Sequence, residues 1–146
     1  MINFRKIDED NFETIVRMKN PDAACFVADN CYSLAQAWLY RDNGDVFPFA
    51  IYDDDVPVGF MLLEEDIDER KLMLWRIMFP PENCRKGFGT AAVRLIIDLA
   101  RESGKYDGLY LDCHEENAAA MGLYKKLGFE PTGDINHGDI EMRIVF

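Results

Sequence analysis

The sequence predicts a single α/β domain with a mixed, mostly antiparallel twisted sheet, one central parallel strand pair and about four flanking helices. Residues 72–79 and 109–113 are apolar and strand-like, and a helical pattern over 91–103 separates them. A connection of this length joins parallel neighbours through a right-handed crossover. Hairpin patterns lie on either side of this unit, over 46–64 and 129–146, and hairpins pair antiparallel strands.

Length and composition limit the class of protein. A chain of 146 residues fits one domain over 1–146, and 49% hydrophobic content is typical of a folded globule. The net charge of -11 argues against a nucleic-acid partner, because phosphate contacts need a basic face. No apolar run reaches transmembrane length and the start is polar, so we expect no membrane partner and a cytoplasmic location. The four cysteines form no C-x-x-C pair and there are only two histidines, so we expect no metal site.

The first half of the chain reads as a strand, two helices and a hairpin. The predicted elements are strand 2–7, helix 11–19, a loop or short helix over 22–30, helix 34–41, strand 46–52 and strand 56–64. Asp8 or Asp10 is the expected cap of the first helix, and Ser33 with Gln36 resembles a capping box before the second. Pro48 predicts an edge position or a bulge, because proline cannot donate to a sheet ladder.

The second half begins with a strand that is apolar on both faces apart from Arg76, which indicates a central position. Pro80-Pro81 is expected to end its pairing. The elements that follow are helix 91–103, closed by Gly104, strand 109–113, a helix from Asn117 to Leu127, and a hairpin of strands 129–135 and 139–146.

A glycine turn at residues 83–90 (Asn-Cys-Arg-Lys-Gly-Phe-Gly-Thr) joins the central strand to its helix. The start of a helix leaves backbone N–H groups free, and the helix dipole adds partial positive charge there. Arg85 and Lys86 add full charges to the turn. The turn therefore predicts a phosphate or pyrophosphate site, with a plain strand-to-helix turn as the alternative.

Two motifs resemble those of the GNAT N-acetyltransferase superfamily. Residues 84–89 fit the frame of its acyl-CoA-binding motif, Gln/Arg-x-x-Gly-x-Gly/Ala, with Cys84 at the first position. Residues 117–129 match its Asn-x-x-Ala-x-x-Leu-Tyr-x-x-x-Gly-Phe motif. The predicted order of elements is similar over essentially the whole chain. The small size and the Leu-Trp-Arg-Ile-Met strand at 74–78 most resemble bacterial spermine/spermidine acetyltransferases.

The resemblance implies a GNAT-like fold and an enzyme that moves an acetyl group from acetyl-CoA, its co-substrate, directly to a primary amine. The implied acceptor is a small cationic molecule such as the polyamines spermidine and spermine, which suits an acidic chain. Acetylation of a protein or peptide, and a non-catalytic acyl-CoA-binding module, are the alternatives. The last hairpin is also a candidate contact surface for a homodimer.

The resemblance also assigns residues. The CoA contacts it implies are Ile77, Phe79, Arg85, Lys86, Gly87, Phe88, Gly89, Thr90 and Asn117. Because this grip depends mainly on backbone N–H groups, we expect binding to tolerate Cys84. Tyr124 is the expected general acid for the leaving thiolate, with a packing tyrosine as the alternative.

The general base is less defined by the sequence. Glu64 is the first candidate, late on a strand expected to flank the central one, and Asp112 on the parallel strand is the second. Further candidates are Glu65, Glu115, Glu116 and His114, and a solvated acidic surface is the alternative. Cys84 and Cys113 read as packing or loop residues, because direct transfer needs no covalent intermediate.

Overall fold

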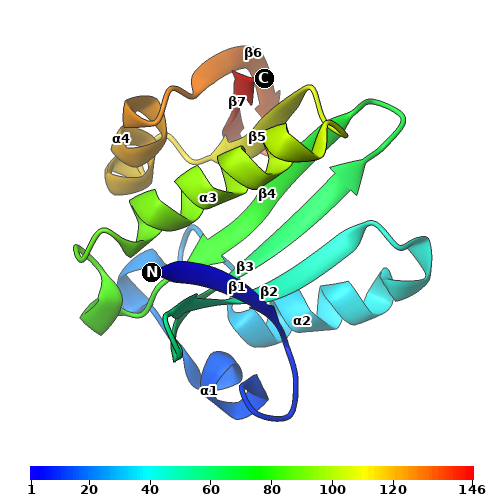
Figure 1. Cartoon of the computed structure of the whole chain (residues 1–146). Coiled ribbons are helices and arrows are strands. Elements are labelled where there is room, and N and C mark those ends of the chain that lie inside the picture. Colours follow the sequence, from blue (N-terminus) through cyan, green and yellow to red (C-terminus); the bar gives the residue numbers. More distant parts are fainter.

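Seven strands form one mixed sheet in the computed structural model, which covers residues 1–146 (Figure 1). The strands are β1 Ile2–Lys6, β2 Val46–Asp53, β3 Val56–Asp66, β4 Lys71–Met78, β5 Gly108–Cys113, β6 Glu130–Asn136 and β7 Asp139–Val145. Their order in the sheet is β1-β2-β3-β4-β5-β7-β6, and only β4 and β5 run parallel. The predicted mixed sheet with one central parallel pair is confirmed.

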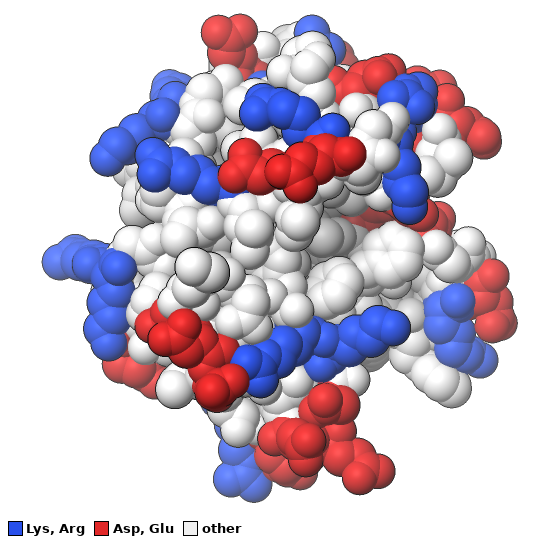
Figure 2. All heavy atoms as spheres, in the orientation of Figure 1, with Lys and Arg blue, Asp and Glu red and all other residues white.

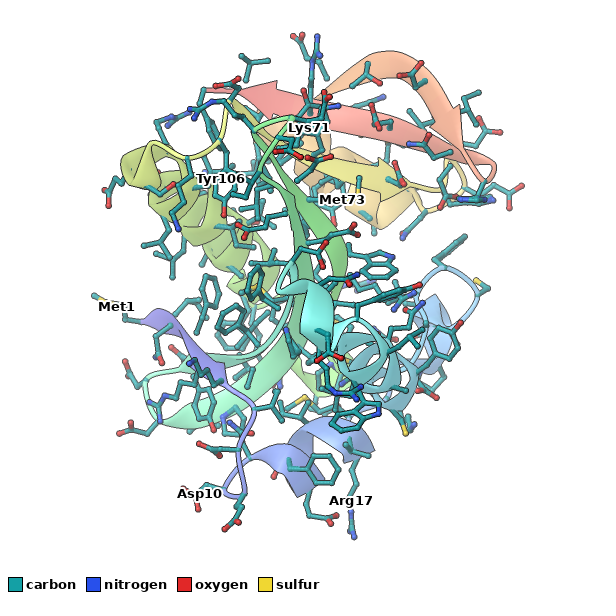
Figure 3. The ribbon with its side chains drawn as sticks, turned by 90° about the vertical axis from the view of Figure 1, so that its right-hand side faces the viewer. Met1, Asp10, Arg17, Lys71, Met73 and Tyr106 are labelled. Carbon is teal, nitrogen blue, oxygen red and sulfur yellow. The ribbon has the colours of Figure 1, made fainter.

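Four α-helices cover the sheet on both faces. They are α1 Phe12–Arg17, α2 Asn30–Leu39, α3 Phe88–Ser103 and α4 Ala118–Lys126, with short 3-10 turns at Pro21–Ala23, Arg41–Asn43 and Pro81–Asn83. Figure 3 shows α3 on one side of the sheet and α1 and α2 on the other, with Tyr106 and Arg17 labelled on these respective sides. None of the helices combines the length and the apolarity that crossing a bilayer requires.

Each face of the sheet has its own apolar core. The core on the α3 face joins that helix to buried residues of β3, β4 and β5, among them Met61, Leu74 and Leu111. The core on the α1 face surrounds Ile15, which is fully buried against Phe60 and its neighbours. Because side chains alternate along a strand, the strands between these cores are apolar on both faces. This explains the continuous apolar runs in the sequence.

The predicted capping box of the second helix is wrong. Helix α2 begins at Asn30, because Asp29 Oδ1 accepts the backbone N–H of Tyr32 at 2.9 Å and caps the helix there. Ser33 lies inside the helix, fully buried, and its hydroxyl accepts a hydrogen bond from Arg76. The side chain of Gln36 also accepts from Arg76, so both polar groups are used by tertiary contacts.

The expected edge position of Pro48 is confirmed locally, whereas the alternative, a bulge, is not found there. Strand β2 lies between β1 and β3, and its register shift falls at Ile51/Tyr52. The pairing with β1 ends at the Lys6–Phe49 pair. Pro48 therefore lies one residue beyond that ladder.

The two halves of the sheet separate within the parallel pair. Strands β4 and β5 are paired only over Lys71–Met73 and Gly108–Tyr110, and Met73, labelled in Figure 3, is the last residue of β4 that pairs with β5. Leu62 and Leu63 of β3 pair with Arg76 and Leu74, so Trp75 forms a β-bulge. Beyond the bulge, β4 keeps only β3 as a partner. The pairing with β3 continues to Met78 and stops before Pro80-Pro81, as expected, whereas the pairing with β5 already ends at Met73.

Candidate active site

Two cavities meet where β4 and β5 separate. The turn cavity, of 750 Å³, is bordered by the glycine turn, the end of β4 and α4. The sheet cavity, of 270 Å³, is bordered by β4, β5, the α1–α2 connection and the β6–β7 hairpin. The residues that line both are Phe26, Val27, Ile77, Asn117, Ala120 and Tyr124. These shared residues define the junction at which the two cavities adjoin.

The glycine turn beside the turn cavity contains an uninterrupted row of free backbone donors. None of the N–H groups of residues 85–90 has a hydrogen-bond partner in the chain, and the first bond of α3 runs from Ala91 N to Gly87 O at 3.0 Å. The left-handed conformations of Arg85 (φ 62°) and Gly87 (φ 83°) turn the chain into the helix. Free N–H groups at the start of a 16-residue helix form an anion site.

Most of the predicted turn residues line this cavity. Those that do are Arg85, Gly87, Phe88, Gly89 and Thr90, whereas Lys86 is not among the lining residues. Helix α3 begins at Phe88, earlier than the predicted 91, because Gly87 acts as its N-terminal cap residue. The first turn of the helix is therefore part of the anion site.

Cys84 makes polar contacts at the start of the glycine turn. Its thiol lies 3.6 Å from the carbonyl oxygen of Phe79 and 3.5 Å from that of Pro80, and the Asn20 amide donates to its sulfur at 3.7 Å. Asn20 also donates to the Phe79 carbonyl at 2.9 Å. The cysteine thus connects the end of β4 to the turn, and it leaves the backbone donors of the turn free.

The end of β4 forms one wall of both cavities. Ile77 pairs with Met61 of β3 and lines both cavities, and Phe79 lines the turn cavity. Because β5 no longer pairs with β4 here, the edge of this segment is open to a bound molecule. Asn117 closes the opposite side as the N-terminal cap of α4, its Oδ1 accepting the N–H of Ala120 at 3.4 Å.

Tyr124 lies at the junction. Its side chain is 7% exposed and packs edge-to-face on Phe129, with ring centroids 5.6 Å apart. The hydroxyl makes no hydrogen bond within the chain, although the residue lines both cavities. Burial, with a smaller contribution from Cys113, raises the pKa of the Tyr124 hydroxyl well above its usual range. The phenol therefore keeps its proton at neutral pH and is free to donate it to a bound molecule.

The two leading candidates for the base lie in different places. Asp112 lines the sheet cavity, and its Oδ1 accepts a hydrogen bond from Asn136 at 3.0 Å. Burial raises the pKa of Asp112, and Glu141 and Asp139 raise it further, whereas the Asn136 bond lowers it. The pKa of the carboxyl group is therefore above its usual value, although the residue is exposed at the surface.

Glu64 lines a separate hollow of 340 Å³ that shares only Trp75 with the sheet cavity. It pairs with Met73, which lines the sheet cavity, so Glu64 is one strand removed from that cavity. Burial raises the pKa of Glu64, and the charges of Asp45 and Asp66 add to the shift. Its role as base stays a prediction.

The remaining candidates for the base either form hydrogen bonds within the chain or line neither cavity. Glu65 accepts a hydrogen bond from the Tyr106 hydroxyl, and burial followed by this bond raises the pKa of Tyr106 to about 12. His114 lines the sheet cavity, where its Nδ1 accepts the N–H of Glu116 at 3.2 Å and its ring lies 5.3 Å from that of Phe26. Glu115 and Glu116 line neither cavity.

The surroundings of Cys113 do not favour a nucleophilic thiolate. Burial raises the pKa of the Cys113 thiol, and the charge of Asp139 adds to the shift, so the unreactive thiol form is favoured. No group of three or more His, Cys, Asp or Glu side chains is arranged to hold a metal ion.

Some lining residues were not predicted as site residues. They are Arg76 on β4, Asn136 and Asp139 on the last hairpin, and Phe26 and Val27 in the α1–α2 connection. Arg76 had a visible signal, as the single charge in an apolar strand. Phe26, Val27 and Asn136 lie in segments predicted as a loop or a turn, and Asp139 begins the last predicted strand.

Charge is distributed unevenly between these walls. Figure 2 shows acidic and basic side chains interspersed over the face that carries α3, with uncharged atoms in a band between them. The excess of acids is thus not gathered into one patch on that face. The turn cavity has Arg85 and Asp22 on its walls, and the sheet cavity has Arg76, Asp112 and Asp139.

A parallel strand pair that opens beside a helix-start anion site is the arrangement of an acyl-CoA-dependent transferase. A model of the acetyltransferase (GNAT) family matches residues 7–129. The chain therefore belongs to the GNAT family of acetyltransferases, and it is an N-acetyltransferase of that type.

Relatives in this family act on different acceptors. The chain is 31% identical over 138 residues to the peptidyl-lysine N-acetyltransferase YjaB of Salmonella typhimurium, covering 91% of this chain and 86% of the relative. It is 30% identical over 89 residues to a spermidine N(1)-acetyltransferase of Escherichia coli, covering 61% of this chain and 48% of that enzyme. The family is thus shown and the acceptor is not.

The fold is shared with solved acetyltransferases. The spermidine N-acetyltransferase of Vibrio cholerae, solved in complex with CoA and spermine, superposes with a TM-score of 0.77 at 19% identity. The match covers 99% of this chain and 95% of that one. This similarity shows the fold alone.

Proposed function

We propose that this protein transfers the acetyl group of acetyl-CoA directly to a primary amine of a small cationic acceptor. The observation that carries the proposal is the place of Tyr124. The residue is buried, its hydroxyl has no partner in the chain, and it lines both the turn cavity, with its free backbone donors, and the sheet cavity, which includes Asp112 and Asp139. A proton donor is needed at that junction, where the thiolate of CoA would leave.

The donor fits the turn cavity. The free N–H groups of residues 85–90 and the charge of Arg85 suit a pyrophosphate. The pantetheine arm would then follow the open edge of β4 past Phe79 and Ile77, with Asn117 on the opposite side. This path brings the thioester to the junction.

The reaction needs two proton transfers at opposite ends. The neutral amine attacks the acetyl carbonyl carbon, so that a C–N bond forms and the C–S bond breaks. A base takes the proton that the amine nitrogen loses, and the Tyr124 hydroxyl gives its proton to the departing sulfur. A free backbone N–H on the open edge of β4 would stabilise the oxyanion. Asp112 is placed to act as the base in the sheet cavity, and Glu64 would act through water.

A polyamine such as spermidine is the first acceptor to test. The support comes from the acidic wall formed by Asp112 and Asp139, and from the spermidine acetyltransferase among the relatives. The side chain of a lysine in a protein is a second candidate. It is supported by the peptidyl-lysine acetyltransferase YjaB, which is similar over most of both chains.

The decisive experiment measures thiol release from acetyl-CoA with spermidine, spermine, amino acids, aminoglycosides and lysine peptides. We expect turnover with at least one amine. Tyr124→Phe should lower kcat by about a hundredfold or more, because that is the usual contribution of a positioned acid. Its CoA dissociation constant, measured by calorimetry, should stay close to that of the wild type.

Two outcomes would contradict the proposal. Protein that binds CoA but releases no thiol with any amine would be a non-catalytic acyl-CoA-binding module. Unchanged turnover in Tyr124→Phe would remove this residue from the role of acid, because phenylalanine keeps the packing on Phe129 and lacks only the hydroxyl.

A further inference from the structure

Arg76 is a half-buried cation on the wall of the sheet cavity. One of its guanidinium nitrogens, Nη1, donates to the Ser33 hydroxyl at 3.1 Å and to the Gln36 side-chain oxygen. Both partners are neutral and belong to α2. Burial lowers the pKa of Arg76, which is the direction expected for a cation that has lost water without gaining an anion.

No carboxylate of the chain neutralises this arginine. Arg76 takes part in none of the ion pairs of the molecule, although the chain has 27 acidic residues and 16 basic ones. Its contacts with the rings of Trp75 (4.8 Å) and Tyr32 (5.5 Å) stabilise a cation only in part. With acids in such excess, a half-buried arginine without an acidic partner is unexpected.

A purely structural role explains half of the side chain. The two bonds from Nη1 connect β4 to α2 and fix the direction of the guanidinium. The guanidinium has further donors on Nη2 and Nε, and no acceptor in the chain bonds to them. A planar guanidinium held on one side and free on the other is arranged for a bidentate oxyanion.

The sheet cavity is therefore bipolar. Arg76 is on its β4 wall, whereas Asp112 and Asp139 are on the walls formed by β5 and the last hairpin, and neither acid pairs with Arg76. A simple polyamine satisfies the acids and leaves Arg76 without an anion. An amine that also carries a carboxylate satisfies both walls.

We propose that Arg76 binds a carboxylate of the acceptor, so that the preferred acceptor is a basic amino acid or a similar carboxylate-bearing amine. This inference rests on the proposed acetyl transfer and narrows its acceptor class. Arg76 acts as a specificity residue, since it holds the end of the acceptor that does not react.

Matched pairs of acceptors test the proposal directly. Lysine and cadaverine differ only by the carboxylate, as do ornithine and putrescine. We expect the wild type to have a kcat/KM at least about tenfold higher for the carboxylate-bearing member of a pair, as expected for a charged hydrogen bond. Arg76→Gln should remove this preference by raising KM for lysine, with kcat for both acceptors and KM for cadaverine within about threefold of the wild type.

Ser33→Ala is the matched control, because it removes one neutral partner of Nη1 and keeps the guanidinium charge. It should retain the preference for lysine. Arg76→Lys keeps a charge without the planar fork and should retain only part of it. Melting temperatures of all three variants separate loss of recognition from loss of folding.

If Arg76→Gln lowers kcat/KM equally for lysine and for cadaverine, Arg76 has a structural role and the proposal is overturned. Equal kcat/KM values of the wild type for cadaverine and for lysine would also overturn the proposal. If no amine is acetylated, the proposed function fails separately. Calorimetric titration of lysine and cadaverine into the CoA-bound protein then decides, because the proposal requires tighter binding of lysine that Arg76→Gln abolishes.

Discussion

At the scale of single residues, the assignment of the base depends on which cavity a carboxylate lines. The loss of solvation raises the pKa values of both Asp112 and Glu64 above their usual values, although Asp112 is the more exposed residue. Only Asp112 lines the cavity that also contains Tyr124. The direction of the pKa shift therefore does not favour one candidate base over the other. Their positions favour Asp112.

This difference predicts how the rate depends on pH. A carboxylate base works only when it is deprotonated, so kcat/KM should rise with pH through its raised pKa and then level off. Asp112→Asn should lower kcat/KM by about a hundredfold and remove that acidic limb. Glu64→Gln should leave kcat/KM within about threefold of the wild-type value and should keep the acidic limb. The reverse result would assign the base to Glu64, as the sequence predicted.

The motifs select candidate site residues from local sequence alone. The glycine turn lines the turn cavity, and Asn117 and Tyr124 line both cavities. Arg76 and Asp112 could not be assigned in this way. Their surroundings depend on a bulge at Trp75 and on α2 and the last hairpin approaching from distant parts of the chain.

At the scale of elements, the start of α3 combines a backbone constraint with the anion site. Gly87 has a φ of 83°, and a Cβ placed there would meet no atom within 4 Å. Gly87→Ala should therefore lose about 1–2 kcal/mol of unfolding free energy through backbone strain alone. Its CoA affinity should also fall, because a shifted turn misdirects the free N–H groups of residues 85–90.

Gly122 provides the control for this prediction. It lies inside α4, and an added Cβ there would also meet nothing within 4 Å. Because its backbone is helical, Gly122→Ala should stabilise the protein by about 0.5–1 kcal/mol. Urea unfolding and CoA calorimetry measure both effects. Similar behaviour of the two variants would contradict a special role for the conformation of Gly87.

The boundaries of elements were less predictable than their existence. Ser33 and Gln36 have the spacing of a capping box, yet tertiary bonds to Arg76 use both side chains, and Asp29 caps the helix instead. Residues 88–90 include a glycine and a β-branched threonine, which are weak helix formers. The structure nevertheless starts α3 there, since Gly87 supplies the turn into the helix.

At the scale of the whole molecule, the sequence predicted the hairpins and the crossover but not the complete strand order. Strand β7 lies between β5 and β6, so the last strand of the chain, and not the one before it, joins the central pair. Both strands of a hairpin have similar local patterns. Which of them meets β5 is decided by packing, as in the pairing of Leu111 with the fully buried Met142.

The charge of the whole chain predicts how salt affects its stability. The net charge is -11, and self-repulsion of this kind favours the unfolded state. The ion pairs that salt would weaken have side chains between 41% and 96% exposed. Exposed pairs contribute little, so screening of the repulsion should outweigh their loss.

The melting temperature should therefore rise when sodium chloride is increased from about 20 mM to about 300 mM at pH 7.5, as the Debye length shortens several-fold. The rise should shrink near pH 5, where protonation of carboxyl groups brings the net charge closer to zero. Choline chloride should act like sodium chloride, because screening does not depend on a particular cation. A melting temperature that falls with salt would instead mean that the surface ion pairs contribute more than the repulsion costs.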